Sequence, residues 1–240
     1  MTHRTAEESL ERYKKEMGRE LGVIFHHLLQ DTYYITSIWD QYETLFERKE
    51  RIDLLNESGG YFYGNVQRIF FEYVVLGICR LTDPVRTGSR HNLTVQRLQT
   101  LVRSDIQAKI GDLIASAISA SAFCRDWRNR QIAHNDLDHS LQVGEPLAQA
   151  TRAGVTDSLI AIHEVLRLPA LAYCDTHLGF TGVDDAASHM LYQLYRGKEQ
   201  KRETIDRLQR TKEFRKSDFE FPIWLSEPDR FNRYDSKRQR

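Results

Sequence analysis

The 240-residue chain has little proline, little cysteine and no excess of charge of either sign. It contains 5 Pro and 13 Gly, too few for a loop-rich β-sandwich or a low-complexity protein. Lys and Arg number 34, as do Asp and Glu, so the formal net charge is zero. This balance excludes a non-specific basic nucleic-acid coat and an acidic disordered chain. With 40% hydrophobic residues, the composition favours a soluble, mostly helical protein with a substantial core.

Long apolar runs and closely spaced cysteines are also missing. No segment reaches the roughly 18 apolar residues of a membrane span, and the N-terminus has no apolar signal core. We therefore expect a cytoplasmic protein that makes no membrane contact. Cys79, Cys124 and Cys174 lie far apart, each inside an apolar helical pattern. Their spacing argues against a disulfide framework or a zinc ribbon and predicts buried thiols.

Apolar residues recur at steps of three and four along most of the chain, which predicts helices. The expected helices run from a Thr5–Glu8 capping box to about 29, from 31 to 55, from 62 to 82, from 93 to 102, from 104 into the 120s, from 156 to 173, and around 190 to 195. Paired glycines in the segment 56–60 should end the second helix, and Pro84 the third. The third is the most apolar and is expected at the centre. The sequence predicts an all-α bundle over residues 1–195.

Residues 196–240 form a predicted extension with a different composition. They hold 14 Lys or Arg and 9 Asp or Glu, a net charge of +5, which leaves −5 for residues 1–195. Six aromatic residues are interleaved with these charges: Phe214, Phe219, Phe221, Trp224, Phe231 and Tyr234. Basic residues with aromatics can bind a phosphate backbone and stack on bases. The alternative that we favour is a solvated helix followed by a segment that packs on the bundle.

The densest polar cluster of the chain is RDWRNRQIAHNDLD, residues 125–138. Its histidine, His134, could take a proton from a ribose 2′-hydroxyl near neutral pH, and its arginines could hold the phosphate. This chemistry needs no metal, and we expect no cofactor. On an ideal helix Arg128 and His134 lie about 9 Å apart along the axis and about 120° apart around it. Convergence therefore requires a helix end near His134, the reach of arginine or a second subunit. Alternatively, these residues only complement a helix C-terminus.

The cluster also resembles a known family. Arg128-Asn129, four residues and then His134 match the signature of the HEPN superfamily of α-helical nucleotide- and RNA-binding proteins: Arg, then Asn, His or Asp, four residues and His. RLTDP, NLTVQRL and RDWRNRQIAHNDLD occur in that order. Together they are similar to the AbiU-type branch of HEPN proteins, associated with bacterial abortive infection of phage. The specific similarity covers roughly residues 70–138, and the fold that it implies is a HEPN-like helical bundle.

The resemblance implies a metal-independent endoribonuclease that works as a homodimer, as a toxin or phage-defence effector with RNA as its substrate. Arg128 and His134 of both subunits would line a shared cleft, and Asn129 would orient the phosphate or the histidine. Cleavage would leave a 2′,3′-cyclic phosphate. An antitoxin protein is a further partner to consider. The alternatives are a non-enzymatic HEPN module that binds RNA, nucleotide or a partner protein, and a structural dimer with an inert motif.

Five further residues are candidates for substrate binding or for support of the site: Arg125, Arg130, Arg80, Asp83 and Asp136. If the third helix packs beside the fourth, Arg80 and Asp83 would end near the same cleft. They could equally form an ion pair at a helix end before proline. Asp136 could hold an arginine or histidine side chain, or it could be a turn residue.

Overall fold

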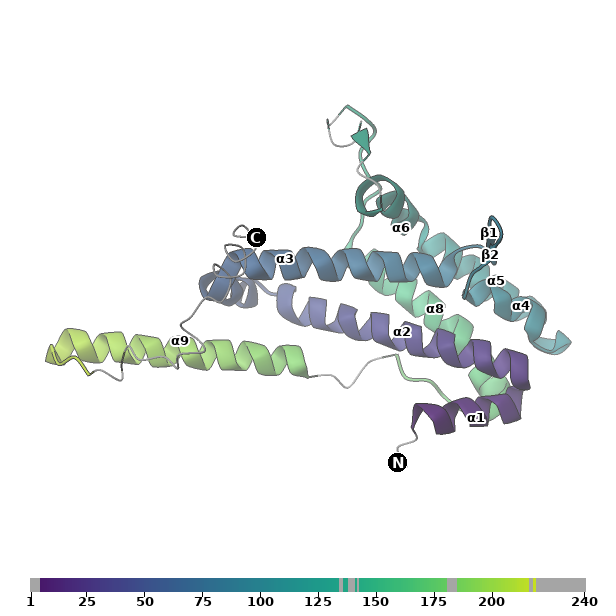
Figure 1. Cartoon of the computed structure of the whole chain (residues 1–240), viewed down its shortest axis with the longest axis horizontal. Helices are drawn as coiled ribbons and strands as arrows, with labels where there is room; N and C mark the ends of the chain where they lie inside the picture. Colours follow the sequence, from purple (N-terminus) through teal and green to yellow (C-terminus); the bar gives the residue numbers. More distant parts are fainter. Residues whose placement is uncertain are drawn as a thin grey trace, which may run out of the picture. The chain divides into compact units, whose positions relative to one another are not determined.

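Long helices dominate the computed structural model, which describes residues 5–133, 136–137, 141, 143–180, 185–215 and 218 (Figure 1). In chain order the elements are α1 (Ala6–Met17), α2 (Arg19–Phe46), α3 (Lys49–Thr82), β1 (Arg86–Thr87), β2 (Arg90–His91), the 3₁₀ turn η1 (Val95–Arg97), α4 (Leu98–Leu101), α5 (Ser104–Ala120), α6 (Ala122–Trp127), the π-helical turn η2 (Arg128–Ile132), α8 (Arg152–Cys174) and α9 (Ala186–Thr211). The predicted all-α class is confirmed. The short antiparallel hairpin of β1 and β2 lies in the polar loop after Pro84.

The N-terminal helices divide at a different residue from the one expected. The capping box is present, with the Thr5 hydroxyl accepting from the Glu8 amide and the Glu8 carboxylate from the Thr5 amide. The helix then ends at Met17, because Gly18 has a φ of 82°, which favours glycine. From Arg19 onward α2 is continuous to Phe46, so the break expected near residue 30 is wrong.

The range of α3 spans two helical segments that meet at a kink inside the predicted stop, residues 56–60. Gly59 at the kink is non-helical, with φ 167° and ψ 62°. This backbone is extended rather than left-handed, so the predicted interruption is present without the expected left-handed geometry. A further break, which was not expected, lies before α3 at residues 47–48. The predicted end before Pro84 is confirmed: Thr82 is the last helical residue, and Asp83 is extended, as a residue before proline prefers.

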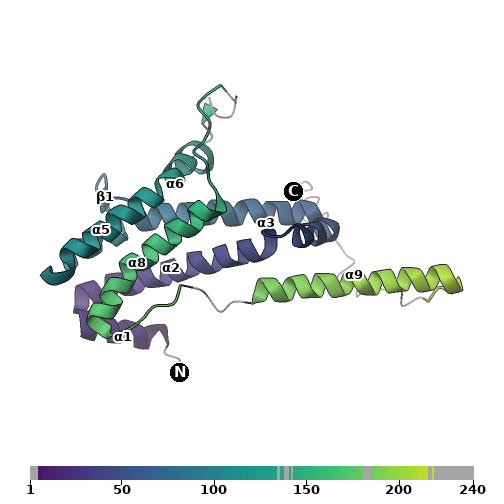
Figure 2. The ribbon, with the colours of Figure 1, turned by 180° about the vertical axis from the view of Figure 1, so that it is seen from behind.

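The helices of residues 1–191 pack in two pairs, α2 with α3 and α5 with α8, and α1 folds back along α2 (Figures 1 and 2). Gly77 allows the close approach of α2 and α3, because a Cβ there would lie 2.6 Å from Ile35 Cδ1. The largest fully buried side chains come from several helices: Phe25, Leu28, Ile35, Trp39, Leu55, Ile78, Leu81, Leu98, Ile110, Leu159, Ile162 and Leu166.

Only part of α3 is central. Its last turns, from Val74 to Thr82, and the isolated Leu55 supply all of its buried residues. Between them, residues 56–73 are half-buried or exposed, and Phe62 is 64% exposed. The expectation that the most apolar helix lies at the centre therefore holds for its C-terminal turns alone.

The chain divides between Leu191 and Tyr192 into two compact units, which we describe separately. In the second unit, α9 runs unbroken past residue 195, where the composition changes. Phe214 is exposed, and Arg207 binds the Asp218 carboxylate at 2.5 Å. The other five aromatic residues of the extension lie outside the described residues, so both interpretations of the extension stay predictions. Across the described helices, none is long and apolar enough to cross a membrane.

Candidate functional site

The C-terminal end of α3 forms the base of the candidate site. A helix end leaves backbone carbonyls without intrahelical partners. Here the Gln96 side-chain amide donates to the carbonyls of Thr82 and Asp83, at 3.0 and 3.1 Å. The Thr82 hydroxyl donates to the Ile78 carbonyl at 2.8 Å. These bonds fix the backbone of Asp83, the residue from which the carboxylate of the site extends.

Arg125 joins α6 to this helix end. Its Nη2 donates to the Thr82 carbonyl at 2.8 Å and to the Thr82 hydroxyl at 3.0 Å. The Ser121 hydroxyl, at the break between α5 and α6, lies 3.2 Å from the same hydroxyl. Arg125 Nε is 4.0 Å from the Asp83 carboxylate. The Arg125 guanidinium therefore lies beside the Asp83 carboxylate, and the neutral oxygens of Thr82 accept its hydrogen bonds.

Arg128, the arginine of the signature, binds Asp83 directly. Its Nη1 lies 2.8 Å from both carboxylate oxygens, and its Nε donates to the Asn129 side-chain oxygen at 3.1 Å. The two side chains of the pair are 28% and 21% exposed, so the guanidinium is held in place but is accessible to solvent. Within the described part of the chain, its Nη2 makes no hydrogen bond.

The chain leaves the α-helical path at Arg128. The Ala133 amide donates to the Arg128 carbonyl at 2.8 Å, five residues back, as in a π-helix. Isolated π-turns of this kind are frequent at functional sites. The ideal-helix separation of Arg128 and His134 that we derived from the sequence therefore does not apply. His134 itself lies outside the described residues.

Arg130 faces a different set of partners. Its guanidinium donates to the backbone carbonyls of residues 145 and 146 and to the Asp126 carboxylate. The other Asp126 oxygen accepts from the Ala148 amide, and Trp127 Nε1 donates to the Ala148 carbonyl, both at 2.7 Å. We call this set of contacts the 145–148 clamp. It ties the segment that returns after the cluster to α6 and η2.

The remaining candidates lie at the edge of this arrangement. Arg80 is exposed and stacks over the Tyr73 ring, 5.7 Å from its centroid. Among the described residues no hydrogen bond or ion pair joins it to Asp83. The Asp136 amide donates to the Arg130 carbonyl at 3.2 Å. The structure thus brings Arg125, Arg128 and Asn129 together around Asp83, with Arg80 on the neighbouring surface of α3.

Two buried cysteines lie next to the arginines. Burial raises the pKa of Cys79 to about 11, an effect that Arg128 and Arg125 reduce and Asp83 reinforces. Burial, reinforced by Cys79, also raises the pKa of Cys124 to about 12. Both thiols therefore stay protonated at neutral pH and act as apolar packing rather than as nucleophiles. Across the described ranges, no group of three His, Cys, Asp or Glu side chains could hold a metal.

Three residues of the site were not identified from the sequence: Thr82, Gln96 and Ser121. Thr82 could have been identified, because it precedes Asp83-Pro84 at a predicted helix end, where backbone carbonyls need hydrogen-bond partners. No local pattern identifies Gln96 or Ser121, because they reach Thr82 only through the packing of η1 and α5 against α3.

In a comparison with protein families, the HEPN-type family model described as AbiU2 matches residues 18–181, more than half of the chain. The matched range contains every residue of the arrangement around Asp83. Comparisons with curated proteins and with solved structures give no match.

Proposed function

The chain belongs to the AbiU2-type HEPN family of abortive infection proteins, and from this premise we propose that it is a metal-independent endoribonuclease. Membership of this family implies a part in abortive-infection defence against phage. The finer proposal concerns the reaction: RNA is cleaved through its 2′-hydroxyl, in a cleft formed by two copies of the chain, and the protein acts as a toxin or defence effector.

The observation that carries the proposal is the state of Arg128. Asp83 fixes this guanidinium at the end of α3, while part of it remains exposed and Nη2 has no partner in the described part of the chain. With Arg125 beside it, the site holds two cations for one carboxylate, so it attracts a phosphodiester. A preorganised arginine stabilises the negative charge that grows on phosphate oxygens in the transition state.

Proton transfer in this proposal belongs to His134. A histidine near its ordinary pKa can take the 2′-hydroxyl proton, and a second can donate a proton to the leaving 5′-oxygen. The 2′-oxygen then bonds to phosphorus as the bond to the 5′-oxygen breaks, which leaves a 2′,3′-cyclic phosphate. One copy of the signature supplies one histidine. Two copies facing each other supply both the base and the acid.

The test is RNA cleavage by the purified full-length protein in excess EDTA. We expect cleavage to persist in the chelator, 2′,3′-cyclic phosphate ends on the products, and loss of cleavage in His134→Ala. His27→Ala, which changes an exposed histidine of α2, is the matched control and should cleave like the wild type. Loss of cleavage in EDTA, or full activity of His134→Ala, would contradict the mechanism.

The contact of Arg128 Nη1 with both Asp83 oxygens favours a second candidate function. An arginine already paired with a carboxylate can serve as a fixed recognition group without chemistry. The protein would then bind RNA, a nucleotide or a partner protein. Binding that requires Arg128, with no RNA product under any condition, would support this function over the ribonuclease.

A further inference from the structure

A short hairpin, residues 86–91 with the sequence RTGSRH, follows the end of α3 (Figure 1). Its two strands pair antiparallel, with Arg86 opposite His91 and Thr87 opposite Arg90. Apart from the glycine, every residue in it carries a side-chain hydrogen-bond donor, and none carries a large apolar group. We call residues 86–91 the basic hairpin.

Hydrogen bonds fix the basic hairpin to the segment at the end of α3. The Asn92 side-chain amide donates to the Pro84 carbonyl and to the Thr87 hydroxyl, both at 2.8 Å. The Asn92 backbone amide donates to the Val85 carbonyl at 2.9 Å. Arg97 of η1 donates to the Asn92 carbonyl at 2.5 Å and to the Val85 carbonyl at 3.4 Å. The backbone on both sides of the hairpin is therefore held in place.

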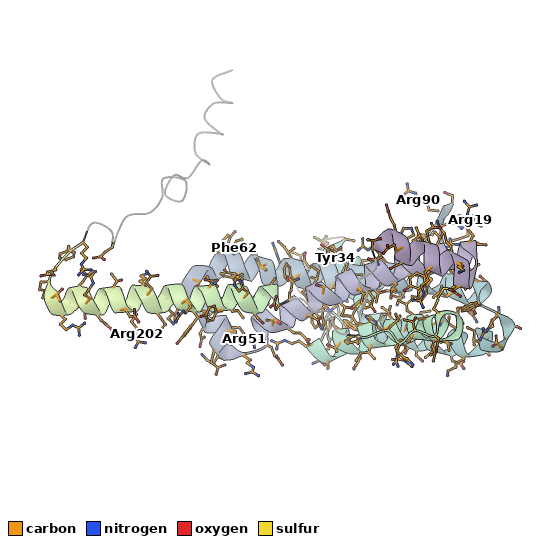
Figure 3. The ribbon with its side chains drawn as sticks, turned by 90° about the horizontal axis from the view of Figure 1, so that it is seen from below. Arg19, Tyr34, Arg51, Phe62, Arg90 and Arg202 are labelled. Atoms are coloured by element: carbon orange, nitrogen blue, oxygen red, sulfur yellow. The ribbon has the colours of Figure 1, made fainter. Side chains whose placement is uncertain are left out.

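The side chains of the basic hairpin, by contrast, are open to solvent. All six residues are exposed, and Arg90 extends from the surface (Figure 3). Within the described part of the chain, no hydrogen bond or ion pair engages the side chain of Arg86, Arg90 or His91. Arg97 instead uses its guanidinium for backbone carbonyls. The basic hairpin thus combines a fixed backbone with donors that are available to a ligand.

The charge around the hairpin is positive, although the helical body as a whole is acidic. Residues 80–97 hold four Arg and one Asp, a net charge of +3, whereas residues 1–195 carry −5. The aspartate of this segment, Asp83, is paired with Arg128. Arg86 follows Asp83 by three residues, so at most about 11 Å separates their Cα atoms. The hairpin and the candidate site therefore form one cationic surface, which attracts polyanions.

We propose that this fixed hairpin binds the phosphate backbone of RNA next to the phosphodiester held at Arg128. The inference rests on the proposed function, because it assigns a second contact to the same substrate. Arginine and hydroxyl side chains are common phosphate ligands in proteins, and such contacts position a strand without reading its sequence. Side chains alternate between the two faces of a strand, so Arg86 and Arg90 lie on opposite faces of the hairpin. Each face therefore offers one guanidinium to the strand.

The composition of the hairpin argues against a protein as its partner. Protein interfaces have a core of buried aromatic or large apolar side chains, which contribute most of the binding energy. The basic hairpin has no such side chain. The exposed large apolar residue that is closest to it in sequence, Leu93, lies outside it. A polyanion fits this surface better than a protein does.

The first test measures the salt dependence of RNA binding by the purified full-length chain. The probe is a single-stranded RNA of about 20 nucleotides, longer than a typical single-strand site. Every 2′-hydroxyl is methylated, so cleavage through this group is blocked. Each phosphate contact on a single strand adds about 0.7 to the slope of log affinity against log salt. We expect Arg86→Gln/Arg90→Gln to reduce this slope by about 1.4 and the affinity on the order of 10-fold near 0.1 M salt.

The matched control is Arg48→Gln/Arg68→Gln, which removes two exposed arginines, one just before α3 and one in its middle. It changes the net charge by the same amount, and its slope and affinity should equal those of the wild type. Circular dichroism melts verify that each variant folds. A wild type that does not bind the probe, a slope unchanged in the hairpin variant, or an equal reduction in the control would overturn the proposal.

The second test separates the position of the hairpin from its charge. Asn92→Ala removes the two side-chain hydrogen bonds to Pro84 and Thr87 and leaves the charge unchanged. We expect RNA affinity to fall about fivefold, because binding must then order the hairpin. The salt slope should stay the same, since both arginines still reach phosphates. Wild-type affinity of Asn92→Ala would overturn the proposal that a fixed hairpin binds the RNA.

Neither test depends on RNA cleavage. A reduced slope in a protein that cleaves no RNA would leave the hairpin contact standing and sink the proposed reaction. Cleavage that requires His134, together with an unchanged slope in Arg86→Gln/Arg90→Gln, would do the opposite. An acidic protein that is recovered with the chain and released by the hairpin variant, with RNA affinity unchanged, would also overturn the proposal.

Discussion

Arg128 and Arg130 lie two residues apart in the same turn, yet they bind different kinds of groups. Arg128 binds two side chains, those of Asp83 and Asn129. Arg130 binds backbone carbonyls of residues 145 and 146 in addition to Asp126. Their exposed fractions are similar, 28% and 23%, so accessibility does not distinguish them. Side-chain acceptors can rotate when a phosphate arrives, whereas backbone acceptors move only with their segment. Under the proposed function we therefore expect Arg128 to bind the substrate and Arg130 to stabilise the surrounding fold.

The largest effect should come from Arg128→Ala. If this guanidinium stabilises the transition state, its removal should lower the rate of RNA cleavage by about 10²- to 10³-fold. The melting temperature should change little, because a partly exposed ion pair contributes little to stability. Single-turnover cleavage and thermal melts measure the two effects. Arg167→Ala, which breaks an exposed ion pair of α8 with Glu164, is the control. Equal cleavage rates of Arg128→Ala and Arg167→Ala would show that Arg128 does not take part in the reaction.

A pH dependence of folding must be separated from that of cleavage. Burial lowers the pKa of His26 in α2 and of His163 in α8, and His163 is the more deeply buried of the two. This side chain is buried against Tyr33 and Phe180, and its Nε2 lies 3.2 Å from the Thr36 hydroxyl. Burial lowers the pKa of His163 to about 4, an effect that Glu164 reduces and Arg167 reinforces.

The ordinary pKa of histidine is about 6.5. Between pH 6.5 and 4, His163 is therefore protonated in the unfolded chain but neutral in the native state. Stability due to His163 is therefore complete above pH 6.5 and falls as the pH drops toward 4, by at most about 3 kcal/mol. Denaturant unfolding at several pH values measures this loss. His163→Gln should flatten the profile, and His27→Gln should not. A flat wild-type profile would refute the assignment.

Arg130→Ala should produce a smaller effect of a different kind. Loss of its bonds to residues 145 and 146 should lower the free energy of unfolding by about 1–2 kcal/mol. Amide hydrogen exchange should accelerate in the 145–148 clamp, and RNA affinity should stay within about twofold of the wild type if the guanidinium contacts no phosphate. A large loss of RNA affinity with unchanged hydrogen exchange would mean that Arg130 contacts the RNA and does not stabilise the clamp.

The smallest effect should come from Asp83→Asn. The substitution removes one negative charge beside Arg128 and Arg125, so RNA affinity should rise about threefold. The maximal cleavage rate should fall by a similar factor, because Arg128 loses its charged anchor. Asp105→Asn, at an exposed pair with Arg103, is the control. A fall in RNA affinity would mean that Asp83 contributes more by positioning Arg128 than it costs in charge.

The helices and the membership of the family were predictable, because they rest on local patterns and on a spaced motif. Pro84 restricts the residue before it, so the end of α3 was predicted correctly. The paired glycines predicted the interruption at Gly59 but not its geometry, because a glycine permits both a left-handed stop and an extended kink. The stop at Gly18 was missed, because a single glycine inside a helical pattern does not by itself mark a helix end.

Less of the candidate site was predictable. The Arg128-Asn129 and His134 spacing identified the signature, and RLTDP indicated that Asp83 could approach it. The two-oxygen contact of Arg128 with Asp83 depends on the packing of α6 against α3, which no local pattern encodes. The clamp partners of Arg130 are backbone carbonyls, which every sequence has. Composition therefore favoured a phosphate contact equally for Arg125, Arg128 and Arg130, whereas the structure places the first two at Asp83 and the third in the 145–148 clamp.

The π-turn of η2 has a consequence for insertions and deletions. The ring that Ala133 closes on Arg128 contains one residue more than an α-helical ring. Deleting Gln131 would keep every residue of the signature, yet it would shorten the spacing to three and restore ordinary helical winding. Substitutions at Gln131 or Ile132 leave the count unchanged. In this turn the number of residues matters more than their identity, so the spacing of the signature is itself a structural parameter.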